Sequence, residues 1–256
     1  MQYTPTYPAV EPLLAELRTG IQMILGPRLI GLYLYGSLVT GDFDPVHSDI
    51  DLLAVLAGAL SEAEFAALDA LHAAFVAAHP QWTERVEIAY LAAGALKTFR
   101  TQASPIAIIS PGEPFHVKEA GNDWLINWWI VRGQGRALAG PPATAVIDPI
   151  GDDEFQAAVR QQVHEWRGYV YEMERRKSQA YAVLTLCRAL YAVANGEQVS
   201  KRRAAEWAAD AFPQWAAQIR QAWAWRTAPD DEGVDHARTR QATVRFAQEV
   251  AEYMGV

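Results

Sequence analysis

The stretch YGSLVTGDFDPVHSDIDLL, residues 35–53, decides the fold of the first half of the chain. An apolar segment, 29–35, leads into it and a second apolar segment, 50–56, leads out of it, and each predicts a β-strand. The residues between the two strands are rich in Gly, Asp and Pro, which are typical of a loop. A strand therefore ends in Gly-Ser, a short connection follows, and the next strand opens with Asp-x-Asp.

The polar residues of this stretch predict a nucleotide site. Asp49 and Asp51 lie two residues apart on a strand, so their side chains project from the same face. Two carboxylates this close repel each other unless a cation lies between them. Mg²⁺ prefers oxygen ligands and needs few from the protein where phosphates supply the others. Gly36 lets the backbone approach a phosphate closely, and the Ser37 hydroxyl and nearby N–H groups can donate to it.

This arrangement resembles a known signature. Gly36-Ser37, followed after eleven residues by Asp49-Ile50-Asp51, is similar to the motif of the DNA polymerase β-like nucleotidyltransferase superfamily. The combination of Gly-Ser, a spacing and Asp-x-Asp is specific, whereas Asp-x-Asp alone is not. The alternative is a glycine turn with a solvated acidic strand end. The resemblance implies an N-terminal nucleotidyltransferase domain with a mixed sheet, ATP as co-substrate, and Mg²⁺ held by the two aspartates.

A third carboxylate is expected on the strand predicted over 85–91, which follows a helix predicted over 61–79. Glu87 lies in the middle of this strand, where a charged group is costly if its face is dry. The resembling superfamily has its third acidic residue on this strand, where it ligates the metal or takes the proton from the attacking hydroxyl. The alternative is a solvated edge-strand Glu, with Glu84 as a competing choice of register.

Length and composition argue against a membrane protein, a secreted protein and a disulfide-bonded protein. The 256 residues suffice for one large domain or two modest ones, and no apolar run reaches the length of a membrane span. The N-terminus lacks the basic-then-apolar pattern of a secretory signal, so we expect a cytoplasmic protein with no membrane partner. The single cysteine, Cys187, excludes an intramolecular disulfide and a cysteine zinc cluster, and we predict that it lies in the core.

The net charge of −8 bears on the acceptor. Nucleic acid polymers prefer basic surfaces, because neutralising their phosphates dominates their affinity. An acidic protein with this site is therefore a poor candidate for a DNA or RNA polymerase and a better one for a small hydroxylated acceptor, including a cationic one.

The rest of the first half is less regular. We predict a helix over 9–24, and we expect His72 to border the apolar stripe of the second helix without ligating a metal. Residues 92–150 are interrupted repeatedly by Pro and Gly, and we interpret them as a bridge between two domains. Within this bridge the Trp-rich run 124–131 is either a strand or a buried helix. We interpret its Trp residues as core, with stacking on a base as the alternative.

The second half changes character from about residue 152, where Gly and Pro become sparse. Helical periodicity predicts five helices, at 152–176, 178–194, 200–211, 213–226 and 235–254, with breaks at 195–196, Pro213 and 229–233. The fold class is therefore an α/β (α+β) domain over 1–150, including the bridge, followed by an all-α helical domain over 151–256. We expect a substrate cleft between the two domains.

The second half also carries a resemblance. The segments AVLTLCRALY (182–191), VSK (199–201) and AAEWA (204–208) resemble the C-terminal helical domain of bacterial aminoglycoside adenylyltransferases of the streptomycin and spectinomycin group. RALAGP (136–141) resembles the segment that precedes that domain. With the N-terminal motif, the resemblance covers most of the chain. It implies a C-terminal substrate-binding domain and Mg²⁺-dependent transfer of AMP from ATP to a hydroxyl of an aminoglycoside-type antibiotic.

Two details of this resemblance concern basic residues. In the family the counterpart of Lys201 reaches toward the ATP phosphates; the alternative is a solvated lysine. The family also has acidic, drug-binding side chains shortly before Val-Leu-Thr-Leu. Here that stretch is RRKSQAY, residues 175–181, with Glu172 and Glu174 before it. A polycationic drug loses binding free energy beside arginines, so this departure argues against the known drugs as acceptors.

Two other functions stay open from the sequence. The same catalytic core occurs in proteins that transfer AMP to another protein, including antitoxin-like partners of toxins, although the long helical half argues against this class. The other hypothesis is a non-catalytic nucleotide-binding module. The presence of Asp49, Asp51 and Glu87 argues for an enzyme, in which Glu87 is the general base and the two aspartates hold Mg²⁺.

Overall fold

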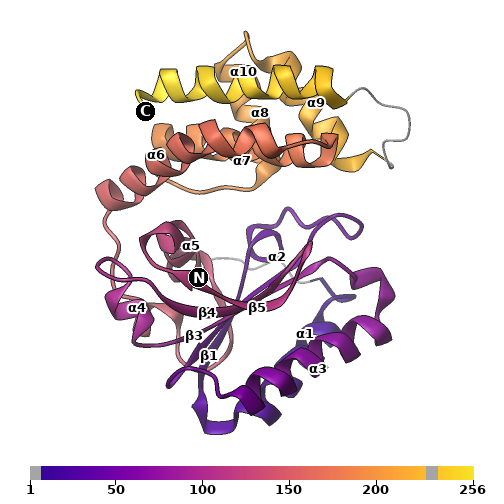
Figure 1. The fold of residues 1–256 in the computed structure, drawn as a ribbon, viewed down its shortest axis with the longest axis vertical. Helices are drawn as coiled ribbons and strands as arrows, with labels where there is room; N and C mark the ends of the chain where they lie inside the picture. The colour runs from indigo at the N-terminus through magenta and orange to yellow at the C-terminus, as the bar shows by residue number, and fades with distance from the viewer. Residues whose placement is uncertain (1–6, 229–235) are drawn as a thin grey trace. The chain divides into compact units, whose positions relative to one another are not determined.

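The computed structural model describes residues 7–228 and 236–256. The chain divides into two compact units, Met1–Ile150 and Gly151–Val256. The first unit is a sheet with helices, and the second consists of helices (Figure 1). The predicted fold class is therefore confirmed.

The first unit is built on a six-stranded sheet in the order β5-β4-β3-β2-β1-β6. The strands are β1 (Leu29–Tyr35), β2 (Ile50–Leu56), β3 (Val86–Ala92), β4 (Ser104–Ser110), β5 (Glu113–Ala120) and β6 (Arg136–Ala139). β2 and β3 pair in parallel, and every other neighbouring pair is antiparallel, so the sheet is mixed. The crossover from β2 to β3 runs through a helix, as parallel strands require.

The helices of this unit are α1 (Glu11–Leu25), α2 (Ser37–Thr40), α3 (Glu62–Ala78), α4 (Ala95–Thr98) and α5 (Leu125–Gln134). α3 begins with a capping box, in which the Ser61 and Glu64 side chains each accept from the other's backbone N–H. The loop that we predicted between β1 and β2 begins with the single turn of α2. Single 3₁₀ turns lie at Gly26–Arg28, Pro80–Trp82, Asn122–Trp124 and Ala143–Ala145.

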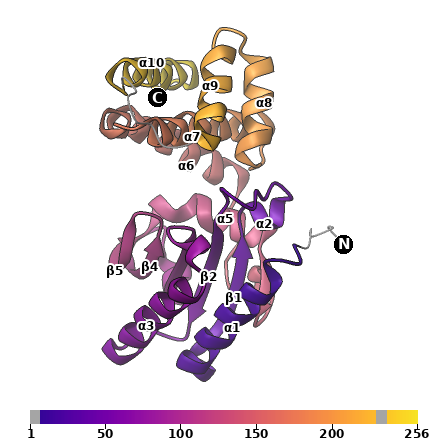
Figure 2. The same ribbon diagram turned by 90° about the vertical axis from the view of Figure 1, so that its right-hand side faces the viewer.

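The two faces of the sheet have different partners. α1 and α3 run together along one face (Figure 2), where they pack against the even-numbered residues of the central strands. These residues include Leu32, Leu34, Ile50, Leu52 and Ile88. α5 packs against β1 and is absent from that core cluster. Because side chains alternate along a strand, the odd-numbered residues face away from α1 and α3.

The segment that we predicted as a bridge, 92–150, is instead part of the sheet unit. It supplies β4, β5 and β6, and so contributes three of the six strands. The Trp-rich run is the helix α5, and Trp128 is buried, which agrees with a core role. The sequence did not reveal these strands because Pro105, Gly112 and Pro114 interrupt the β pattern at strand ends and in the β4–β5 turn.

His72 departs from its predicted place at the border of the apolar stripe. It is only 3% exposed, and its Nε2 lies 2.8 Å from the Tyr90 hydroxyl, beside the ring of Phe115. Burial lowers the pKa of His72 from its usual 6.5 to about 4. The side chain is therefore neutral in the folded protein at ordinary pH.

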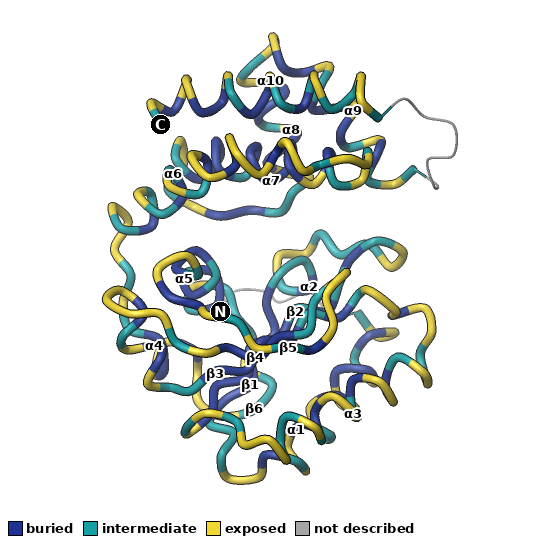
Figure 3. The backbone as a smooth tube through the Cα atoms, in the orientation of Figure 1, coloured by how far each residue is buried: buried dark blue, intermediate teal, exposed yellow. Residues whose placement is uncertain are grey.

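The second unit packs four helices around α7. Its helices are α6 (Asp152–Tyr169), α7 (Arg176–Asn195), α8 (Lys201–Ala211), α9 (Ala216–Thr227) and α10 (His236–Met254), with a 3₁₀ turn at Val170–Glu172. α7 contacts all four others and is buried along most of its length (Figure 3). Cys187 lies in this core with a pKa raised to about 12 by burial, as its predicted role requires.

The breaks between these helices follow the predicted signals in part. α7 ends at Gly196, whose φ of 71° is the left-handed conformation expected of a C-cap glycine. Helix α9 begins at Ala216, three residues later than predicted, and α6 ends at Tyr169, seven residues earlier. The break predicted at 229–233 lies outside the described residues. Within the described ranges, no helix is both long and apolar enough to cross a membrane.

Gly140 follows β6 and lies directly against the backbone of β1. Its φ is +81°, and a Cβ added to it would overlap the Ile30 carbonyl oxygen. We expect Gly140→Ala to lower the free energy of unfolding by about 2 kcal/mol or more, because the backbone conformation is strained and the strand must move. Gly133→Ala, in the exposed part of α5 with open space around it, is the matched control and should stabilise by about 0.5–1 kcal/mol. Urea unfolding measures the stability of both variants. Equal stabilities would contradict the close contact between Gly140 and the backbone of β1.

The buried His72 predicts a pH dependence of stability. Its folded-state pKa lies below the unfolded value, so below about pH 6.5 the unfolded chain takes up a proton that the folded protein refuses. This term should cost up to roughly 3 kcal/mol as the pH falls to about 4. Urea unfolding of His72→Phe should show a shallower loss over this range than the wild type. His164→Gln, at an exposed position, should leave the slope unchanged; identical slopes for all three proteins would refute the assignment.

Candidate active site

Gly36 marks the turn at which β1 meets the site. It follows the last residue of β1 with φ 72° and ψ −150°, a conformation that disfavours any side chain. A Cβ at this position would overlap Oδ2 of Asp51 on the neighbouring strand. Glycine is therefore required on two counts, and it brings the turning backbone directly against the Asp51 carboxylate.

Tyr35, Asp51 and Glu87 lie in one row across three adjacent strands. Tyr35 of β1 pairs with Asp51 of β2, which in turn pairs with Glu87 of β3. Neighbouring strands lie about 4.8 Å apart, and paired residues point to the same face. That face is the odd-numbered one, opposite α1 and α3. The structure therefore brings Asp51 and Glu87 together beside Gly36.

The Tyr35 hydroxyl donates a hydrogen bond of 3.1 Å to Oε1 of Glu87. Burial raises the pKa of Tyr35 well above its usual value, and the negative charges of Glu87 and Asp51 raise it further. The phenol therefore stays protonated and acts as a donor. This residue was not singled out from the sequence, because its partner lies 52 positions along the chain.

Ser37 and Asp49 flank this row. Ser37 is half-buried and opens the single turn of α2 directly after Gly36. Asp49 is half-buried one residue before β2 begins, and its charge acts on the Arg85 guanidinium. Burial lowers the pKa of Arg85, while Asp49 and Asp44 oppose that shift.

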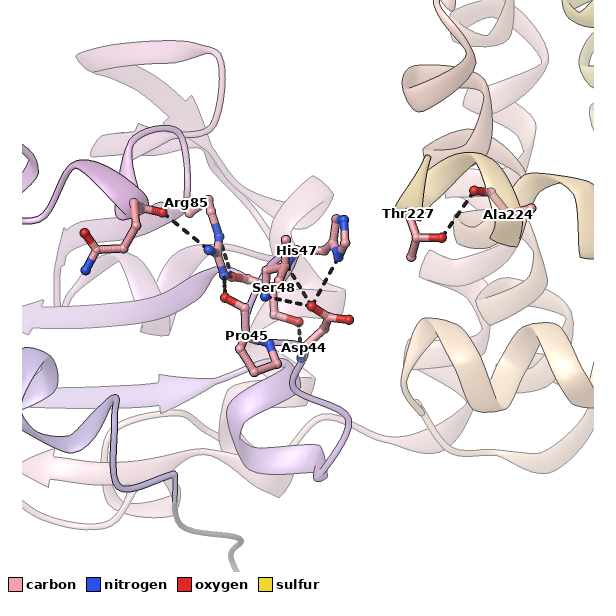
Figure 4. Close-up of polar contacts among 9 residues, drawn as sticks. Asp44, Pro45, His47, Ser48, Arg85, Ala224 and Thr227 are labelled. Carbon is pink, nitrogen blue, oxygen red and sulfur yellow. Dashed lines mark hydrogen bonds and ion pairs between the residues drawn. The ribbon is translucent and has the colours of Figure 1, made fainter. Parts of the chain in front are cut away.

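Arg85 donates hydrogen bonds to the loop that carries Asp49 (Figure 4). Its Nε donates to the Ser48 carbonyl at 3.0 Å and its Nη2 donates to the Pro45 carbonyl at 3.0 Å. Its guanidinium also lies 4.5 Å from the centre of the Trp82 ring. Because two of these partners are carbonyls of the motif loop, Arg85 anchors the loop to the start of β3. We did not predict this role, since the partners are 37 and 40 residues away.

The loop is also ordered from within. Oδ1 of Asp44 accepts backbone N–H bonds from Val46 at 2.7 Å and His47 at 3.0 Å, and the Asp44 N–H donates to the Ser48 hydroxyl at 2.9 Å (Figure 4). Burial would raise the pKa of Asp44, but these N–H donors and His47 lower it overall. An Asp that caps the amides two and three residues later is a recognisable turn signal, so sequence reasoning could have found this feature.

The competing register at Glu84 places that residue elsewhere. Glu84 is exposed in the turn before β3, with a φ of 58°, and its carboxylate accepts from the Gly112 N–H. It is therefore not in the row formed by Asp51 and Glu87.

Lys201 belongs to the second unit. It is the first residue of α8, whose N-cap Ser200 accepts from the Arg203 N–H at 3.2 Å. Its Nζ lies 4.6 Å from the centre of the Tyr181 ring. The side chain is thus held near the N-terminus of a helix, where anions are favoured.

Asp49, Asp51 and Glu87 are the carboxylates that could contribute to a metal site. In the ranges 7–228 and 236–256, no group of three or more His, Cys, Asp or Glu side chains is placed to hold a metal ion by itself. The adjacent pair Asp51 and Glu87 nevertheless offers the oxygen donors that Mg²⁺ prefers. Because Mg²⁺ keeps waters and substrate phosphates as ligands, the residues fit an ion that arrives with a nucleotide.

Both halves of the chain match models of known protein families. The family model for the nucleotidyltransferase domain matches residues 14–119, and the model for the C-terminal domain of aminoglycoside adenylyltransferase matches residues 145–253. Aminoglycoside (3'') (9) adenylyltransferase from Shigella flexneri is 26% identical over 219 residues, which cover 79% of this chain and 82% of the relative. The protein of the same name from Klebsiella pneumoniae is 27% identical over 213 residues and 80% of each chain.

A solved structure has the same fold. It is the spectinomycin adenyltransferase AAD(9) from Enterococcus faecialis with ATP and spectinomycin. The TM-score is 0.76 at 16% sequence identity, and the match covers 94% of this chain and 98% of that one.

The contact between Gly36 and Asp51 predicts a selective defect. We expect Gly36→Ala to weaken binding of Mg·ATP at least about tenfold, because the new methyl group displaces the Asp51 carboxylate. Gly112→Ala is the matched control, since its φ of +81° imposes similar strain but no atom lies within 4 Å of the added Cβ. Isothermal titration of both variants measures the effect. Equal binding by the two would mean that Asp51 need not lie where the structure has it.

Proposed function

Because the chain belongs to the aminoglycoside adenylyltransferase family of the nucleotidyltransferase superfamily, we propose that this ATP-dependent adenylyltransferase moves AMP from Mg²⁺-bound ATP to a hydroxyl of an aminoglycoside-type antibiotic. The observation that carries the proposal is the row in which Asp51 and Glu87 lie side by side against Gly36. It joins a close approach for phosphate, a pair of hard oxygen ligands and a candidate base within one site.

The first step is to bind the nucleotide. Gly36 lets the turning backbone lie against the Asp51 carboxylate, and the Ser37 hydroxyl and nearby N–H groups donate to a phosphate oxygen at this turn. Asp49 and Asp51, with Glu87, would hold Mg²⁺. When bound, Mg²⁺ supplies charge neutralisation for the phosphates and for the departing pyrophosphate. In the helical unit, Lys201 at the N-terminus of α8 offers positive charge to an anion.

The second step is the transfer itself. Glu87 accepts the proton of the acceptor hydroxyl, and the oxygen attacks the α-phosphorus in line with the leaving pyrophosphate. The bond between the α-phosphorus and the bridging oxygen breaks, and the acceptor keeps AMP as a phosphodiester. Glu87 suits this task because its strand holds it on the same face as Asp51.

Recognition of the acceptor is assigned to the helical unit. The match to the C-terminal domain of aminoglycoside adenylyltransferase supports this assignment. The basic stretch at the start of α7 disfavours a highly cationic acceptor, since Arg175 and Lys177 are exposed. The Arg176 guanidinium lies 5.9 Å from the Trp225 ring centre. Glu172 and Glu174 are also exposed in this region and provide carboxylates for an amine.

The acceptor class is tested by pyrophosphate release from Mg·ATP with spectinomycin, with streptomycin and with a cell lysate. Mass spectrometry of the products then identifies what has gained AMP. Release with a drug and an AMP–drug adduct supports the proposal. Release only with lysate protein would point to a protein AMP-transferase, and binding of ATP without release under any condition would point to a non-catalytic module.

The aspartates should be essential for transfer and dispensable for folding. We expect Asp51→Asn and Asp49→Asn each to lower the rate of transfer by about a thousandfold or more, because each removes a charge that Mg²⁺ requires. The melting temperature should change little. Asp69→Asn makes the same chemical change at an exposed position of α3 and should retain full activity. Substantial turnover in either site variant would remove that residue from the metal site.

Glu87→Gln should separate binding from chemistry. The amide keeps the shape of the side chain but cannot take a proton, so kcat should fall by about a hundredfold or more while Mg·ATP still binds. Glu84→Gln, three residues earlier in the exposed turn, should transfer normally. If Glu84→Gln were inactive and Glu87→Gln active, the general base would lie in the other register.

A further inference from the structure

Three buried tyrosines of the sheet each make one hydroxyl contact, and only one of them reaches the site. The Tyr33 hydroxyl donates to the Pro141 carbonyl at 3.0 Å, and the Tyr90 hydroxyl lies 2.8 Å from His72. The Tyr35 hydroxyl instead donates to a carboxylate oxygen of Glu87. Because buried hydroxyls need a partner, all three contacts have a structural purpose, but only the third also acts on a reactive group.

The position of Tyr35 explains how its hydroxyl contacts Glu87 two strands away. It is 7% exposed at the end of β1, and its partner Glu87 lies two strands away, beyond Asp51. Two strand spacings amount to roughly 10 Å, which the combined lengths of a tyrosine and a glutamate side chain span. Strands fix both backbones, so the hydrogen bond restricts the otherwise flexible end of Glu87.

We propose that Tyr35 is a positioning residue that holds the Glu87 carboxylate in the orientation needed to accept the proton of the acceptor hydroxyl. The inference rests on the proposed function of Glu87. The hydroxyl donates to Oε1, so the hydrogen bond favours one orientation of the carboxylate and leaves Oε2 to face the acceptor. A general base must lie within hydrogen-bond reach of the proton that it takes, and a flexible base meets this condition only part of the time.

The test is Tyr35→Phe, which deletes only the hydroxyl. We expect kcat to fall about tenfold or more while the KM for ATP stays within about twofold, since the loss of a hydrogen bond to a charged group affects the proton transfer rather than nucleotide binding. Tyr33→Phe is the matched control, because it removes a buried hydroxyl from the same strand whose partner is a carbonyl outside the site. It should lose similar stability and keep its kcat. Unchanged kcat in Tyr35→Phe would overturn the inference.

A double-mutant cycle shows whether Tyr35 acts through Glu87. In the Glu87→Gln background, with no base to orient, adding Tyr35→Phe should leave the residual rate unchanged. A further tenfold loss in that background would mean that Tyr35 acts elsewhere, and it would overturn the positioning role.

Crystal structures of the wild type and Tyr35→Phe decide the matter independently of turnover. The inference expects one orientation of the Glu87 carboxylate in the wild type and a rotated or divided one in the variant. An identical carboxylate in both would overturn it. Absence of transfer by the wild type with every acceptor would instead refute the proposed function, while these two structures would still test the contact between Tyr35 and Glu87.

Discussion

The site depends on the close approach of a turning backbone to a carboxylate. Gly36 has a left-handed φ, and the space that a Cβ would need is filled by Asp51 of the adjacent strand. The strand pairing of β1 and β2 fixes this contact, since Tyr35 and Asp51 are register partners. An acidic group is thus fixed at the turn where a phosphate can approach the backbone, and the electrostatic demand for a cation follows from that geometry.

The remaining parts of the site follow from how the sheet is assembled. Parallel pairing of β2 with β3 aligns Glu87 with Asp51, and the helical crossover α3 makes that pairing possible. Packing of α1 and α3 on the even-numbered residues leaves the odd-numbered face for a second apolar layer, which includes Leu53 and Val55, with Asp51 and Glu87 near the ends of their strands. Arg85 then holds the motif loop by donating to two of its carbonyls. Both faces of the sheet therefore have buried apolar residues, and the carboxylates Asp51 and Glu87 lie at one end of the odd-numbered face.

Local patterns predicted the parts of this fold that are decided locally. The ends of β1 and β2 match the apolar runs because the Gly, Asp and Pro residues between them cannot continue a strand. Strands β4 to β6 escaped prediction, since their pairing depends on partners distant in sequence and Pro and Gly obscure their alternation. The same limit applies to Tyr35 and Arg85, whose site contacts form only on folding. His72 was misjudged because the stripe it borders is covered by Phe115 of β5, one of the unpredicted strands.

The most direct test of the central claim is a crystal structure of the protein with Mg²⁺ and a non-hydrolysable ATP analogue. It measures the position of the triphosphate relative to Gly36, Asp51 and Glu87. The account predicts phosphate oxygens beside Gly36, an ion shared by Asp51 and the phosphates, and Glu87 facing the space next to the α-phosphorus. A triphosphate bound elsewhere, or a Glu87 carboxylate turned away from the α-phosphorus, would contradict it.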